Sequence, residues 1–175
     1  MHHLIKVVED MLLLAQVDSL QKLPLKHEDL LEIVSEAVDT TGPKAREKGV
    51  VISFNVDEKL LASYDHIELP VMGDLLKSAI LNLIDNAIDF SPLQGIVKVF
   101  VARRENRFVI QIEDDGPSIP DIFLPRLFKR FERYDGSKRK GSGLGLSITK
   151  KIVELHGGEL RLVKHQEGTI FEIIL

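Results

Sequence analysis

Apolar residues recur every three or four positions in four long stretches of the chain, and this spacing predicts amphipathic helices. The stretches cover residues 1–20, 27–47, 74–90 and 144–156. Pro43 stands inside the second stretch. Because proline lacks the N–H that a helix interior uses, we expect a break or kink near Thr41–Gly42.

Shorter stretches rich in β-branched and aromatic residues lie between the helices and predict strands. They cover residues 50–56, 96–102, 107–113, 159–163 and 169–175. Residues 57–73 fit no single element, although a short strand before Gly73 is compatible with them. Glu105–Asn106 joins two strands as a hairpin, which makes them antiparallel. Helices and hairpins in alternation predict an α/β (α+β) two-layer sandwich: a mixed, largely antiparallel sheet with helices on one face, preceded by an N-terminal helix.

Composition excludes several classes of protein. Hydrophobic residues make up 44% and charged residues 29% of the 175-residue chain, which is typical of a folded globular protein. The net charge of -4 does not favour nucleic acid or an anionic membrane as a partner. The absence of cysteine excludes a disulfide framework and a thiolate zinc site. Since no apolar stretch approaches the roughly 20 residues that span a bilayer, we expect a soluble, cytoplasmic chain.

Two asparagines lie one turn apart in the third predicted helix. Asn82 and Asn86 share a face because residues i and i+4 of a helix are neighbours, and the opposite face is continuously apolar. A polar face turned towards solvent would explain the pair. An amide oxygen is, however, also a suitable ligand for Mg²⁺, which prefers oxygen donors. Either interpretation fits this helix on its own.

An acidic turn follows the strand predicted at residues 107–113. Asp114 stands at the end of that strand, and Gly116 follows in the turn. A carboxylate fixed at a strand end can accept a hydrogen bond from an exocyclic amine such as that of adenine. Asp and Gly are also ordinary turn residues, so a plain turn is the alternative.

A glycine-rich loop opens the last predicted helix. It consists of Gly141, Ser142, Gly143, Leu144 and Gly145. Glycines let backbone N–H groups approach phosphate oxygens, and a helix start favours an anion. The loop is not a P-loop, because no Gly-Lys-Ser/Thr follows it. Lys138, Arg139 and Lys140 precede it and either form a solvated loop or supply cations that suit a triphosphate.

A Phe pair lies between the acidic turn and the glycine loop. Phe128 and Phe131 are three residues apart, and Arg133 follows them. They fit an anchor for a lid over a ligand and also fit packing in the core, and the two roles are compatible.

In this order, the asparagine helix, the Asp-x-Gly turn, the Phe-x-x-Phe segment and the Gly-x-Gly-x-Gly loop resemble the N, G1, F and G2 boxes of the histidine-kinase catalytic domain, a member of the GHKL superfamily. The resemblance covers residues 25–175. It implies an ATP-binding domain of a two-component sensor histidine kinase, which transfers the γ-phosphoryl group to a histidine. The cofactors that it implies are ATP and Mg²⁺.

The resemblance also implies roles for single residues. Asn86 becomes the Mg²⁺ ligand, Asn82 a support on the phosphate side, and Asp114 the acceptor of the adenine amine. The loop Gly141–Gly145 borders the phosphates, together with the basic residues 138–140.

Two further parts of the site are implied by the same resemblance. Residues 120–140, with Phe128, Phe131 and Arg133, correspond to the lid. Thr169, after Gly168, lies close to the adenine pocket.

Four positions bear on the reaction or depart from the family pattern. ATPases of the superfamily carry a glutamate one turn before the magnesium-binding asparagine, whereas this chain has Asn82. An amide cannot take a proton from water, which favours phosphoryl transfer over hydrolysis. Asp89 and Phe90 stand where the family has Lys and Tyr, and Ser118 replaces a glycine. The Asp89 carboxylate places repulsion near the phosphates, which either lowers the affinity for ATP or is offset by residues 138–140.

Residues 1–22 resemble the second helix of the family's dimerisation and phosphoacceptor hairpin. The first helix, with the phosphorylated histidine, has no counterpart, and His2 and His3 do not match its motif. We therefore expect a fragment that binds ATP without phosphorylating itself. Its implied partners are a phosphoacceptor helical domain, within a homodimer, and a response regulator, in a parent protein that could be anchored in the inner or plasma membrane. Periodicity alone also allows this helix to pack on its own domain.

Two alternatives use the same fold. One is a serine kinase of the anti-sigma type, which has no need for the first helix. The other is an interaction module whose nucleotide site has decayed, as Asp89 and Ser118 suggest.

Overall fold

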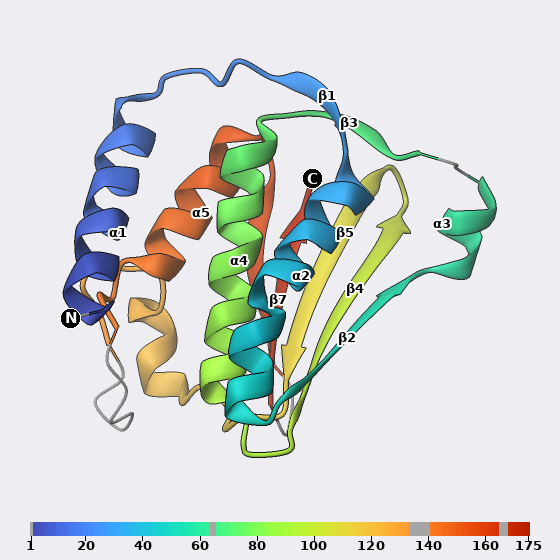
Figure 1. Ribbon diagram of the computed structural model, residues 1–175. Coiled ribbons are helices and arrows are strands. Elements are labelled where there is room, and N and C mark those ends of the chain that lie inside the picture. Colours follow the sequence, from blue (N-terminus) through green and yellow to red (C-terminus); the bar gives the residue numbers. More distant parts are fainter. Residues whose placement is uncertain (1, 64–65, 134–140, 165–167) are drawn as a thin grey trace.

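The computed structural model describes residues 2–63, 66–133, 141–164 and 168–175 (Figure 1). A five-stranded sheet has the order β2-β4-β5-β7-β6. Its strands are β2 (Val51–Val56), β4 (Ile96–Arg104), β5 (Arg107–Asp114), β6 (Glu159–Lys164) and β7 (Thr169–Ile174). β2 and β4 run parallel and the other neighbours antiparallel, so the expected mixed, largely antiparallel sheet is confirmed.

Three helices cover one face of this sheet: α2 (Leu30–Lys48), α4 (Gly73–Phe90) and α5 (Gly145–Leu155) (Figure 1). The apolar side of α4 fills the space between the layers. Five of its side chains have no exposed surface: Leu76, Ile80, Leu83, Ile84 and Ile88. Burying one such side chain contributes about 1.5–3 kcal/mol. The two-layer sandwich is confirmed, and α4 holds its polar side in a fixed place.

The start of α2 differs from the expectation of a helix from residue 27. Residues 26–29 form β1 (Lys26–Asp29), which pairs antiparallel with β3 (Glu68–Val71) in a separate two-stranded sheet. The Oδ1 of Asp29 then accepts a hydrogen bond from the N–H of Leu31 at 2.8 Å. This N-cap and the pairing with β3 hold the segment extended until residue 30.

The expected break at Pro43 is also wrong, because α2 runs through it without interruption. A proline inside a helix costs about 3 kcal/mol, partly through a clash with the preceding residue. That residue is Gly42, which has no Cβ to clash. Packing offsets the rest, since Ala37, Thr41 and Ala45 are buried on the side of α2 that faces α4.

Two short helices complete the chain between the larger elements. α3 (Glu58–Ser63) precedes β3, and the 3-10 helix η1 (Asp121–Arg126) lies in the segment that the resemblance assigns to the lid. β3 itself confirms the short strand considered before Gly73.

The first helix, α1 (His2–Ser19), folds back against α5 (Figure 1). Val17 is fully buried in a small cluster with Leu75 and Ala79 of α4 and with Ile148 and Ile152 of α5. Its second half therefore packs on its own domain. Between residues 4 and 12, by contrast, the helix exposes a row of apolar residues: Leu4, Ile5, Val8, Met11 and Leu12. Among the described residues, no helix has the length and hydropathy that crossing a membrane requires.

Candidate functional site

The segments singled out in the sequence meet at one end of the sandwich. There the last turns of α4, the end of β5, the start of α5 and the segment after η1 come together (Figure 1). Three glycines connect them by close approach: Gly116 lies against the backbone of Phe90, Gly143 against the backbone of Phe131, and Gly145 against the side-chain amide of Asn82. The structure thus assembles residues that are far apart in the chain.

On the sheet side of this end, Asp114 and Thr169 are direct partners on the antiparallel strands β5 and β7. Both are buried, with exposed fractions of 4% and 6%. The Oδ1 of Asp114 accepts a hydrogen bond from the N–H of Gly116 at 2.8 Å, which fixes the carboxylate in the turn. Two of the residues assigned to the adenine side are therefore brought together.

Gly168 explains how this corner closes. A Cβ at Gly168 would lie 2.1 Å from the carbonyl oxygen of Asp114, and its φ of +88° is in the left-handed region. Both facts exclude a side chain there. The backbone at Asp114 is consequently held on one side by Gly168 and on the other by its own turn.

On the helix side, the amide of Asn82 connects α4 to α5. Its Nδ2 donates to the Oγ1 of Thr149, which is fully buried, at 2.9 Å. A Cβ on Gly145 would lie 2.5 Å from the Asn82 Oδ1, so a glycine is needed for this close approach. Asn82 therefore sets the position of the glycine loop relative to α4.

Asn86 lies one turn further along α4 and is half-buried. Its amide has no hydrogen-bond partner within the part of the chain that the structure describes. Across those same residues, no three His, Cys, Asp or Glu side chains form a group that could hold a metal ion. An amide oxygen of this kind fits Mg²⁺ that keeps its waters and arrives with phosphate oxygens.

The glycine loop uses its polar atoms to keep its shape. The Oγ of Ser142 accepts from the N–H of Leu144 at 3.1 Å and donates to the carboxylate of Asp10 in α1. Gly143 has a φ of +72°. The Leu144 side chain is fully buried beside α1 and α5, so only its backbone can face a ligand. Lys138, Arg139 and Lys140 lie outside the described residues.

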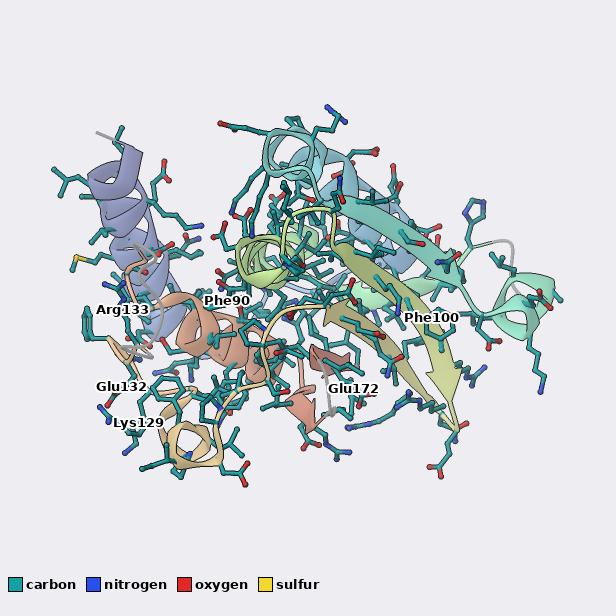
Figure 2. All side chains as sticks on the ribbon, turned by 90° about the horizontal axis from the view of Figure 1, so that it is seen from below. Phe90, Phe100, Lys129, Glu132, Arg133 and Glu172 are labelled. Carbon is teal, nitrogen blue, oxygen red and sulfur yellow. The ribbon has the colours of Figure 1, made fainter. Side chains whose placement is uncertain are left out.

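The two phenylalanines of the expected lid have different surroundings. Phe128 packs edge-on against Phe171, with ring centroids 6.5 Å apart, and Lys150 lies over its ring. Phe131 is 61% exposed, has a φ of +61°, and donates its N–H to the carbonyl of Gly143. Figure 2 shows Arg133 near α1. The first phenylalanine belongs to the core and the second to the rim of the site.

Lys44 is a site residue that the sequence reasoning missed. It extends from α2 to the carboxylates of Asp85 and Asp89, at 2.9 and 3.1 Å from its Nζ. Lys48, one turn later, donates to the carbonyls of Asp89 and Ser91 at the end of α4, each at 2.7 Å. The only signal in the sequence is the spacing of the two lysines, which places them on one face of α2.

The chain was compared with known proteins. A family model described as "Histidine kinase-, DNA gyrase B-, and HSP90-like ATPase" matches residues 72–175. The sensor histidine kinase CusS of Escherichia coli O6:H1 is 35% identical over 97% of this chain and 35% of its own length. The sensor protein KdpD of Clostridium acetobutylicum is also 35% identical, over 97% of this chain and 18% of its own. The chain therefore spans about a third or less of these relatives.

Solved structures give the same result for the fold. The catalytic domain of histidine kinase ThkA has a TM-score of 0.74 and 25% identity, over 87% of this chain and 95% of that one. Full-length ShkA in complex with AMPPNP has a TM-score of 0.82 and 24% identity, over 98% of this chain and 35% of that one. ThkA in complex with the response regulator TrrA has a TM-score of 0.77 and 21% identity, over 98% of this chain and 46% of that one.

Proposed function

Because the chain belongs to the family of histidine kinase-, DNA gyrase B- and HSP90-like ATPases, we propose that it is the ATP-binding catalytic domain of a two-component sensor histidine kinase. The γ-phosphoryl group of ATP would pass to a histidine on a phosphoacceptor helix. The observation that carries the proposal is the convergence of Asp114, Asn86 and the glycine loop at one end of the sandwich.

The base would bind at the sheet side of this end. The Asp114 carboxylate can accept the hydrogen bond that the exocyclic amine of adenine donates, and Thr169 lies directly opposite it on β7. Both side chains are buried, so this polar pair is shielded from water, where a hydrogen bond discriminates best between bases.

The phosphates would bind between α4 and the start of α5. Backbone N–H groups at the helix start and the helix dipole favour an anion there. Asn86 would hold Mg²⁺, whose charge neutralises the phosphate oxygens during phosphoryl transfer. The glycine loop, the basic residues 138–140 and the lid residues Phe131 and Arg133 would surround the triphosphate.

Asn82 favours phosphoryl transfer to a protein over hydrolysis. A general base that activates water must accept a proton, and an amide cannot do so. Its Nδ2 is moreover engaged with Thr149, which gives Asn82 a positioning role between α4 and α5.

The partners follow from the same proposal. ThkA, one of the solved relatives, was captured with a response regulator, and CusS and KdpD are sensor proteins. We propose that residues 1–22 are the second helix of a phosphoacceptor hairpin, which a first helix would complete within a homodimer. The phosphorylated histidine would then pass its phosphoryl group to a response regulator in the cytoplasm. These relatives are named as histidine kinases or sensor proteins, so a serine kinase of the anti-sigma type finds no support.

The proposal is tested by nucleotide binding and by transfer. Wild-type protein should bind Mg-ATP in calorimetry, and Asn86→Ala should weaken that binding at least tenfold with little loss of stability, because its side chain is half-buried. Asn55→Ala, on the exposed side of β2, is the matched control and should bind as the wild type does.

Transfer is measured with ATP labelled at the γ-phosphate and the phosphoacceptor hairpin of CusS as acceptor. Acid-labile label on that hairpin would support the proposal that the chain is a histidine kinase catalytic domain. If the wild type does not bind Mg-ATP, the proposal is refuted. If it binds ATP but transfers the phosphoryl group only to water, the chain is an ATPase domain and not a kinase domain.

A further inference from the structure

Two carboxylates stand beside the residue proposed to hold Mg²⁺. Asp85 comes directly before Asn86, and Asp89 is three positions after Asn86, on the last turns of α4. Their side chains are 25% and 46% exposed, and both residues lie within one helical turn of the half-buried Asn86. Two negative charges at this place repel a triphosphate, which carries the same sign.

One ammonium group lies between these two carboxylates. The Nζ of Lys44 is 2.9 Å from the Oδ1 of Asp85 and 3.1 Å from the Oδ1 of Asp89. Lys44 belongs to α2, and its neighbour Ala45 is buried in the core, so the backbone from which the lysine extends is fixed. Its own side chain is 38% exposed and is not committed to the core.

Among the described residues, the other lysines near these carboxylates do not fill the same place. Lys48 donates to backbone carbonyls at the end of α4, including those of Asp89 and Ser91. Lys6, from α1, is 3.3 Å from the Oδ2 of Asp85 and forms no ion pair with Asp89 in the described part of the chain. Lys44 is thus the group that connects both carboxylates, and it does so from a helix packed along the whole of α4.

Building on the proposed ATP-binding function, we propose that Lys44 is a positioning residue of the phosphate site, which cancels the charge of Asp85 and Asp89 so that Mg-triphosphate can bind at Asn86. It acts through the carboxylates and not by contact with the phosphates. The ligand class whose binding depends on it is therefore a magnesium-bound nucleoside triphosphate. A nucleoside without phosphates should bind independently of Lys44.

The test compares Mg-ATP with adenosine, each measured by calorimetry on the same protein. Lys44→Met keeps the length and apolar stem of the side chain and removes its charge. We expect it to weaken Mg-ATP binding about three- to tenfold and to leave adenosine binding unchanged. Adding Asp89→Asn to Lys44→Met should restore most of the lost affinity, because Asp89 is then neutral and Asp85 keeps its ion pair with Lys6.

The chain offers a matched control on the same pair of helices. Lys77 of α4 pairs with Glu36 of α2 at 2.9 Å, near the start of α4 and remote from Asn86. Lys77→Met breaks an ion pair between the same two helices, and it should change neither affinity. Thermal unfolding of each variant verifies that it is folded.

Three results would overturn the inference. Mg-ATP affinity unchanged in Lys44→Met would show that the charge is not needed. An equal loss for adenosine would indicate a structural role. Failure of Asp89→Asn to restore binding would indicate direct contact with the phosphates. If the wild type itself does not bind Mg-ATP, the proposed function fails as well; if it binds and only these comparisons fail, the proposed function stands without Lys44.

Discussion

The two ends of the candidate site are built in different ways. At the adenine end, Asp114 and Thr169 are buried partners on adjacent strands, and Gly168 holds the backbone in place. At the phosphate end, half-exposed side chains from separate helices are joined by polar contacts, such as those of Lys44 with Asp85. Changes at the first end should therefore affect folding and base recognition together, whereas changes at the second should affect phosphate binding and leave the fold intact.

The largest effect is expected at Gly168. Gly168→Ala places a Cβ against the carbonyl oxygen of Asp114 at a positive φ, which should destabilise the protein by about 3–5 kcal/mol. Denaturant unfolding measures this loss. Gly157 also has a positive φ, +72°, but nothing lies near its absent Cβ. Gly157→Ala should therefore cost only about 1–2 kcal/mol of backbone strain, and equal losses in the two variants would contradict the close packing at Asp114.

A smaller effect is expected at Asp114 itself. Asp114→Asn keeps the size of the side chain and the turn, but replaces a charged acceptor by a neutral amide. Losing a hydrogen bond to a charged group costs about 1.5–3 kcal/mol, so affinity should fall about 10- to 100-fold. ATP and adenosine should be weakened alike in calorimetry, in contrast to Lys44→Met. A loss confined to ATP would mean that Asp114 does not contact the base.

The smallest effect is expected at His156, because its hydrogen bond stabilises the fold on which both ends of the site depend. The Nε2 of His156 accepts a hydrogen bond from the N–H of Met72 at the start of α4, at 3.1 Å. Burial lowers the pKa of His156 below its ordinary value of 6.5. The unfolded chain therefore binds a proton that the folded chain resists, and stability is lost as pH falls below about 6.5 towards the lowered pKa.

This pH effect is measured by thermal unfolding between about pH 7.5 and pH 5. His156→Gln should remove part of the slope in that range, while His27→Gln, in β1, serves as the control. A wild-type melting temperature that rises as pH falls through this range would contradict the role given to His156.

Much of the fold followed from local patterns. The apolar side of α4 and the alternation in β4 and β5 reflect the period of a helix or strand. The glycine at the end of α2 is likewise a local signal. All of these depend on residues close in the chain. The segments around Asp114, Asn86 and Gly143 could be predicted for the same reason, because each is a short motif. The two errors, at Lys26–Asp29 and at Pro43, concern places where pairing with β3 and packing on α4 outweigh local preference.

What the sequence by itself determined is therefore the long helices and the strands of the main sheet, their order and the chemical groups available for a nucleotide. The tertiary structure decided which of these groups meet. It placed Phe128 in the core and Phe131 at the rim, packed the second half of α1 on α5, and brought Lys44 to Asp85 from 41 residues away. The physical reason is that an ion pair or a buried contact depends on how whole helices pack, whereas helical spacing depends only on the backbone of one segment.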